Sequence, residues 1–173
     1  MMIAFTIRKF QPSDLGQILK LFRDTIRSIN IRDYSQEQIN AWAPENLDRE
    51  KWLHSISKNI TYVAEISGNI VGFGDANKDG YLDRLYTHKD FQGKGIATAI
   101  LKKLEEELKK LGITEVSTEA SITAKPFFEL CDEEKIDGLA KKTGGACETR
   151  TCKERVLDWL QANKMSWIPL LTS

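Results

Sequence analysis

The stretch from Asp90 to Leu108, DFQGKGIATAILKKLEEEL, places two glycines directly before a strongly periodic helix. Glycine starts a helix poorly, so a glycine pair at this point indicates that the backbone itself is needed there. The first amides of a helix are unpaired and carry the positive end of its dipole, and glycines let an anion approach them. The spacing favours a phosphate-binding loop about as strongly as it favours a plain tight turn. The buried face of the helix is predicted to consist of Ile96, Ile100, Leu104, Leu108 and Leu111.

Better-known binding motifs do not fit this sequence. No Gly-Lys-Ser/Thr follows the glycine pair at the spacing of a Walker A loop, and the GxGxxG dinucleotide pattern is missing. The stretch DANKDGYLDRLY at 75–86 begins like an EF-hand calcium loop, but Tyr86 stands where a bidentate Glu is required. Both flanks alternate as strands, so the stretch predicts a hairpin turn, and we expect no metal site.

Composition argues against several function classes. With 173 residues, 41% hydrophobic and 29% charged, the chain is long enough for one soluble domain. A formal net charge of zero gives no electrostatic case for binding nucleic acid or a membrane, and no run approaches transmembrane length. The N-terminus MMIAFTIRKF is typical of a strand rather than a signal peptide. Three cysteines without metal spacing indicate reduced thiols in the cytoplasm, with pairing of Cys147 and Cys152 under oxidation left open.

Periodicity predicts a mixed α/β domain: one strand, helices, three strands, a helix, a strand and a helix. Ser35 and Gln38 have capping-box spacing at the start of the second helix, and Pro44 is expected to end it. The predicted strands cover residues 3–8, 60–66, 70–76, 81–88 and 113–120, and the predicted helices cover 12–26, 35–43, a short segment around Trp52 and Ile56, 95–111 and 124–130.

Several segments together resemble one enzyme family. QGKGIA at 92–97 matches the Q/R-x-x-G-x-G/A signature of the GCN5-related N-acetyltransferases, and it follows a strand, Leu85 to Thr87, similar to the family's own. Ser121, Ala124 and Phe128 stand at the positions of the family's Asn-x-x-Ala-x-x-x-Tyr segment. With DYSQEQINAWAP and DRLYTH, these segments resemble a bacterial subgroup of the family over residues 3 to about 131.

The resemblance implies a fold and a domain boundary. The family fold is a central, mostly antiparallel sheet whose fourth and fifth strands splay apart, expected here within residues 1–131. The tail at 132–173 departs from the family: residues 133–145 and 153–164 are predicted to be helices where two final strands are expected. We expect this tail to pack on the same domain or on a partner subunit, as in a homodimer. A poorly ordered extension is the alternative.

The resemblance also implies a site for acetyl-CoA as co-substrate. The pyrophosphate would lie on the amides of Gly93 to Thr98, and the pantetheine arm would pair with the backbone of Leu85 to Thr87. A backbone amide near Leu85 or Tyr86 would stabilise the developing oxyanion. The residues expected to bind the cofactor are Leu85, Tyr86, Thr87, Gln92, Gly93, Lys94, Gly95, Ile96, Ala97, Thr98, Ser121 and Phe128.

Two carboxylates are candidates for the general base that the amine needs. Asp83 is the first choice, since it lies on the strand beside the thioester where many family members carry Glu; its alternative is an ion pair with Arg84. Glu119, at the end of the next strand, is the second. Phe128 replaces a tyrosine that often protonates the leaving thiolate, so no general acid is assigned.

Aromatic residues early in the chain are expected to form the acceptor wall. In this family the helices after the first strand cover the acceptor site, which makes Tyr34 and Trp42 the expected substrate-binding residues, whereas Trp52 is more typical of the core. Such a wall suits a cationic or aromatic amine. The predicted function is transfer of an acetyl group to an amine, with small molecules favoured over peptides. The alternative is a coenzyme A-binding module that has lost catalysis.

Overall fold

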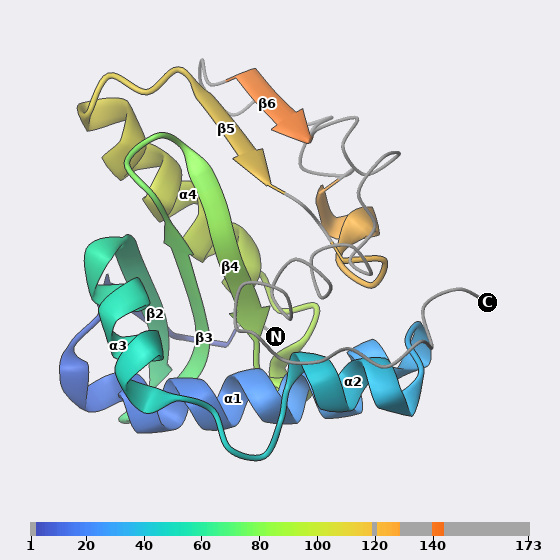
Figure 1. Ribbon diagram of the computed structural model, residues 1–173. Helices are drawn as coiled ribbons and strands as arrows, with labels where there is room; N and C mark the ends of the chain where they lie inside the picture. The colour runs from blue at the N-terminus through green and yellow to red at the C-terminus, as the bar shows by residue number, and fades with distance from the viewer. Residues whose placement is uncertain (1–2, 119–120, 129–139, 144–173) are drawn as a thin grey trace.

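One sheet runs through the part of the chain that the computed structural model describes, residues 3–118, 121–128 and 140–143, and its strand order is β1-β2-β3-β4-β5-β6 (Figure 1). Strands β1 to β4 pair antiparallel, whereas β4–β5 and β5–β6 pair parallel. This confirms the mixed α/β class and the mostly antiparallel sheet. The elements in chain order are β1 (Thr6–Lys9), η1 (Pro12–Asp14), α1 (Leu15–Ser28), η2 (Asn30–Arg32), α2 (Gln36–Trp42), α3 (Arg49–Lys58), β2 (Ile60–Ile66), β3 (Asn69–Ala76), β4 (Tyr81–Thr87), η3 (Lys89–Phe91), α4 (Ile96–Lys110), β5 (Glu115–Thr118) and β6 (Ala140–Thr143).

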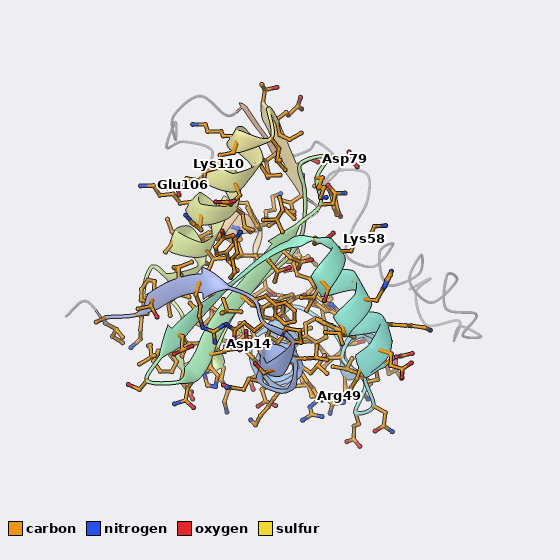
Figure 2. All side chains as sticks on the ribbon, turned by 90° about the vertical axis from the view of Figure 1, so that its left-hand side faces the viewer. Asp14, Arg49, Lys58, Asp79, Glu106 and Lys110 are labelled. Carbon is orange, nitrogen blue, oxygen red and sulfur yellow. The ribbon has the colours of Figure 1, made fainter. Side chains whose placement is uncertain are left out.

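Helices cover both faces of the sheet, and each face has its own core. Alternate strand residues point to opposite faces, so Val63 of β2 packs in the core with α1 and α3, while its neighbours Tyr62 and Ala64 pack in the core with α4. Figure 1 shows α4 behind the sheet, α1 and α3 in front of it, and α2 beyond the end of α1. Figure 2 shows Glu106 and Lys110 on the outer side of α4, away from the buried stripe that contacts the strands.

Short helices that lead to the site are fixed by their caps. As predicted, Ser35 and Gln38 form a capping box: Ser35 Oγ accepts from the Gln38 N–H at 3.2 Å, and Gln38 Oε1 accepts from the Ser35 N–H at 2.9 Å. Asp48 caps α3 in a similar way, since its Oδ1 accepts from the Lys51 N–H at 3.1 Å. Caps of this kind contribute about 1 kcal/mol each. They define where α2 begins and hence where Trp42 at its end lies.

The stretch that starts like a calcium loop is a hairpin, as predicted. Strands β3 and β4 flank it, and Asn77 Oδ1 closes the turn by accepting from the N–H groups of Asp79 and Tyr81 at 3.0 and 2.9 Å. Figure 2 shows Asp79 at the outer end of this hairpin. Asp75 lies before the turn, fully buried and paired with Arg84, so its carboxylate does not belong to a surface loop.

The tail prediction is wrong at residues 140–143. They form β6 rather than part of the helix expected over 133–145, and β6 pairs parallel to β5, from Glu115↔Ala140 to Thr118↔Thr143. The edge of β5 offers a row of backbone donors and acceptors, and pairing with it outweighs a weak local helix preference, weakened further by the two glycines that follow Thr143. The helix expected over residues 153–164 lies outside the described residues.

Candidate active site

In the described part of the chain, strands β4 and β5 pair at two positions, Tyr81↔Ser117 and Leu82↔Thr118, and the Thr118 hydroxyl donates to the Leu82 carbonyl oxygen at 3.0 Å. This short contact agrees with the splayed strands that the family resemblance implied. Strand β4 then continues to Thr87. A cavity of about 510 Å³ lies beside this stretch of β4, lined by the loop before α4, by residues of α1 and α2, and by the 121–128 segment.

A β-bulge re-aims one carboxylate into this cavity. The pairing of β3 with β4 passes from Asp75↔Arg84 to Ala76↔Leu82, so Asp83 is the extra residue of the bulge. Its side chain is one-third exposed and lines the cavity, and its Oδ2 lies 3.1 Å from Arg84 Nη2. The ion pair between Asp83 and Arg84, which the sequence analysis gave as the alternative, therefore exists. The Asp83 carboxylate nevertheless lines the cavity, as a general base would have to.

Arg84 joins Asp83 to a buried polar network. Its Nε and Nη2 donate to the two oxygens of Asp75 at 2.8 Å each, Nη2 also donates to Ser55 Oγ at 2.7 Å, and Asn59 Nδ2 donates to Asp75 Oδ2 at 2.7 Å. Burial raises the pKa of Asp75, while the charge and hydrogen bonds of Arg84 act against that rise. Burial alone would lower the pKa of Arg84, but Asp75 outweighs it and keeps the guanidinium charged.

Along β4, the backbone N–H and C=O groups point alternately toward β3 and toward the cavity. The His88 N–H donates to the Val71 carbonyl oxygen at 2.8 Å, and hydrogen-bonded pairs alternate along an antiparallel ladder. Tyr86 therefore directs its backbone groups toward β3, and Leu85 directs its own toward the parted edge. The Thr87 carbonyl oxygen is occupied, because it accepts from Thr25 Oγ1 at 3.0 Å and from Gln92 Nε2 at 2.6 Å.

The two glycines of the loop have the conformation that their residue type allows. Gly93 has φ +69° and Gly95 has φ +79°, a region that costs other residues energy. A Cβ placed at either glycine would meet no heavy atom within 4 Å, so packing does not explain them. Gly95 is the N-cap of α4, no side chain caps this end, and the first helical bond runs from the Ala99 N–H to the Gly95 carbonyl oxygen at 3.0 Å. The open side of this helix terminus faces the cavity.

The predicted cofactor residues lie along this one cavity. Lining residues that the sequence predicted for the cofactor are Leu85, Tyr86, Thr87, Gln92, Gly93, Lys94, Gly95, Ile96, Ala97, Thr98, Ser121 and Phe128. Phe91 and Phe127, which no motif singled out, also line it. Phe91 directly precedes the glycine motif, so the motif could have indicated it, and Phe127 adjoins Phe128. Glu119, the second candidate base, lies outside the described residues.

The acceptor wall differs in part from the expectation. Trp42 lines the cavity, whereas Tyr34 is 9% exposed and is not a lining residue. Trp52 belongs to the core, as expected, with its ring centroid 4.6 Å from that of Phe22 and 4.9 Å from Arg84 Cζ. Sequence reasoning missed three lining residues near the end of α1, namely Thr25, Ile29 and Asn30, because their helical spacing is indistinguishable from that of core residues.

The described part of the chain holds neither a candidate metal site nor a membrane-spanning helix. Within residues 3–118, 121–128 and 140–143, no three His, Cys, Asp or Glu side chains are grouped so that they could hold a metal ion. No helix in the same ranges combines the length and the apolar character needed to cross a membrane. The cavity beside β4 is therefore the site on which the functional argument rests.

Comparison with known proteins matches this architecture. The family model of the acetyltransferase (GNAT) domain matches residues 30–139. The uncharacterized N-acetyltransferase YafP of Escherichia coli K12 is 35% identical over 123 residues, which span 71% of this chain and 77% of that protein. The spermidine N(1)-acetyltransferase of Thermoplasma acidophilum is 28% identical over 123 residues, spanning 65% and 76%. The crystal structure of the PaiA N-acetyltransferase of T. acidophilum in complex with coenzyme A shares the fold, with a TM-score of 0.66, 24% identity and coverage of 79% and 95%.

Proposed function

Since the chain belongs to the GCN5-related N-acetyltransferase family, whose co-substrate is acetyl-CoA, we propose that it acetylates a small, cationic amine by direct attack on the thioester. The observation that carries the proposal is that the glycine loop, the Leu85 edge and the Asp83 carboxylate line a single cavity. A cofactor arm and an acceptor amine can therefore meet beside the bulge of β4. The name of the T. acidophilum spermidine acetyltransferase supports a cationic acceptor.

The cofactor half of the proposal uses backbone groups. The pyrophosphate would accept hydrogen bonds from the first amides of α4, with Gly93 and Gly95 leaving room for its oxygens. The pantetheine arm would pair with the backbone of Leu85 at the parted edge. This pairing would bring the thioester carbonyl close to the Leu85 N–H, which we assign as the oxyanion donor in preference to that of Tyr86 because of the ladder alternation.

The acceptor half uses charged and aromatic side chains. Asp83 and Arg84 line the cavity, and the charge of Arg84 is already offset by its ion pair with the buried Asp75, which leaves the Asp83 carboxylate to attract an ammonium group. Trp42 offers a ring face to the same cation. A small-molecule acceptor fits such a recessed, charged end better than a surface for a folded protein would.

The ammonium must lose two protons in all. The first goes to Asp83, directly or through water, and the neutral nitrogen then attacks the thioester carbonyl carbon. The nitrogen of the tetrahedral intermediate gives up the second proton to solvent, the C–S bond breaks, and coenzyme A leaves as a thiolate that takes up a proton from solvent. Phe128, which is 8% exposed and lines the cavity, has no proton to give, so no general acid is assigned.

One observation favours a second candidate function. A phenylalanine at the position of the frequent tyrosine is also what a coenzyme A-binding module without catalysis would tolerate. The two candidates differ in what Asp83 does, because a binding module has no use for a carboxylate beside the thioester.

A screen of amines separates these candidates. The full chain is mixed with acetyl-CoA and with polyamines, diamines, aromatic amines, amino sugars and short peptides, and thiol release is followed. The proposal predicts amine-dependent thiol release, fastest for small cations. Tight binding of acetyl-CoA by calorimetry with no amine-dependent release would favour the binding module, and preferential acetylation of peptides would contradict the acceptor class.

A cytoplasmic location and a homodimer remain predictions. Light scattering of the full chain measures the oligomeric state. One chain has a mass of 19.7 kDa, and a homodimer is expected to show twice that mass. A single-chain mass across micromolar concentrations would rule the homodimer out.

A further inference from the structure

Two hydrogen bonds connect two segments of the chain that each contribute to the wall of the cavity at its acceptor end. The Tyr34 hydroxyl oxygen accepts from the Ile122 N–H at 2.9 Å. In the next residue pair, Thr123 Oγ1 donates to Asp33 Oδ2 at 2.7 Å. These partners are 88 and 90 residues apart in the sequence, and Figure 1 shows the segments they belong to, between η2 and α2 and after β5, on the same side of the molecule.

Neither Asp33 nor Tyr34 is a lining residue, yet each contacts a part of the chain that supplies lining residues. The Tyr34 ring packs edge-on against Trp42, with centroids 5.3 Å apart and planes at 74°. On the other wall, Thr123 lines the cavity between Ser121 and Ala124. Tyr34 is buried, so its ring and hydroxyl have one defined arrangement rather than several.

We propose that Asp33 and Tyr34 form a bridge that positions Trp42 against the 121–128 segment and thereby determines which amines the acceptor end admits. The inference rests on the proposed function, since it concerns the acceptor of that reaction. Both residues act through others and are positioning residues. The bridge contacts Ile122 and Thr123 and leaves the glycine loop untouched, so we expect a larger effect on the amine than on acetyl-CoA, although Ser121 and Phe128 of the same segment belong to the expected cofactor residues. Slim cations with a terminal amine are admitted, and branched amines are rejected because they would need the two walls to separate.

Tyr34→Phe and Asp33→Ala test the bridge, because the first keeps the ring against Trp42 and neither substitutes a lining residue. Each variant is expected to raise the KM of the best amine about threefold to tenfold, the effect of losing one ordinary hydrogen bond. The kcat and the Kd of acetyl-CoA are expected to stay within about twofold, and the KM ratio between branched and slim amines is expected to fall. In the double variant, the rise in the amine KM should be smaller than the product of the two single-variant rises, because both hydrogen bonds connect the same two segments.

Tyr81→Phe and Thr6→Val are the matched controls. Tyr81 lies at the start of β4 and is not a lining residue. The hydroxyl of Thr6 on β1 donates to the Glu65 carbonyl oxygen on β2, and neither residue lines the cavity. Unchanged amine KM in the bridge variants, or equal changes in the controls, would overturn the proposal. So would a KM rise matched by equal losses in acetyl-CoA affinity and Tm, because a general loss of structure would then explain it.

Exchange of the Ile122 amide keeps the bridge testable apart from catalysis. If no amine is acetylated by the unaltered chain, the proposed function fails, and hydrogen exchange followed by NMR still decides the bridge. Exchange at Ile122 is expected to be slow in the unaltered chain and at least tenfold faster in Tyr34→Phe. Equal exchange rates in the two proteins would contradict the bridge itself.

Discussion

The two halves of the cavity differ in the groups that line them: main-chain groups in the cofactor half and side chains in the acceptor half. The cofactor half uses main-chain groups: the open end of α4, the positive-φ glycines and the parted edge of β4. The acceptor half uses side chains, among them Asp83 and Arg84 of β4 and Trp42 of α2, brought together from two separate elements. Backbone geometry restricts which residues can stand at a position, whereas a side-chain wall can be made in many ways. A short sequence motif therefore identifies the cofactor half and says little about the acceptor half.

The largest effect on the free energy of unfolding is expected at the buried ion pair between Arg84 and Asp75, next to the acceptor half. Arg84→Met removes the only cation that contacts the buried Asp75 in the described part of the chain, and breaking such a pair costs about 3–5 kcal/mol of unfolding free energy. Urea denaturation measures this loss. Lys20→Met, which removes the exposed ion pair between Lys20 and Asp24, is the control and should cost less than about 1 kcal/mol. Equal losses would show that the buried pair does not hold the acceptor half.

The second effect separates chemistry from binding. Asp83→Asn is expected to lower kcat at neutral pH by about two orders of magnitude, because the amide cannot take the amine's proton. The calorimetric Kd of acetyl-CoA should stay within about twofold, since the cofactor half is unchanged. Asp79→Asn, at the hairpin tip, is a matched control with unchanged kcat. Normal turnover by Asp83→Asn would move the role to Glu119 or to a water chain.

The third effect concerns the pH dependence of stability, which we attribute to the buried Asp14 carboxylate and its pair with Arg8 on β1. Burial alone would raise the pKa of Asp14, but the hydrogen bonds from Arg8, at 2.8 and 2.9 Å, and from the Gln11 N–H outweigh it and lower that pKa. Because the pKa is lower in the folded state, the unfolded state binds more protons as the pH falls. The stabilisation is complete above the ordinary pKa, 3.8, and is lost as the pH falls through the lowered folded value.

Asp14→Asn should therefore cost about 1–3 kcal/mol at pH 7 and remove part of the acid sensitivity. Chemical denaturation at pH 7 and at pH 3 measures the difference, which should be smaller in the variant than in the unaltered chain. Asp24→Asn is the control on the solvent side of α1. A variant with undiminished acid sensitivity would contradict the role of Asp14.

The smallest effect distinguishes two tryptophans. Trp42→Leu is expected to raise the amine KM about threefold to tenfold, the range of a partly desolvated cation–π contact, with little change in acetyl-CoA affinity. Trp52→Leu should instead lower Tm, because its ring packs against Phe22 and Arg84. Interchanged results, with Trp52 affecting KM and Trp42 affecting Tm, would reverse the assignment of wall and core.

What the sequence predicted follows the same division. The hairpin in place of a calcium loop, the capping box at Ser35 and the loop at Gly93 and Gly95 rest on local rules, and the structure has the hairpin, the cap and the positive φ values. The bulge at Asp83 needs the register of two strands, which no local pattern of one strand reveals.

Contacts distant in sequence were beyond sequence reasoning. The bond between Tyr34 and Ile122 joins residues 88 positions apart, so no periodicity could suggest it. Strand β6 was missed for a similar reason, because the edge of β5, not the composition of residues 140–143, decides their conformation.

Acetyl-CoA affinity in Gly95→Ala and Gly112→Ala tests the central claim, that main-chain groups at the start of α4 hold the cofactor. The two glycines flank the same helix, both have φ +79°, and neither has a heavy atom within 4 Å of a built Cβ, so the strain of the substitution is matched. Calorimetry should show at least a tenfold weaker Kd for Gly95→Ala, about 1.4 kcal/mol or more, and a change below about twofold for Gly112→Ala, with similar Tm values. Equal affinity in the two variants would contradict the account.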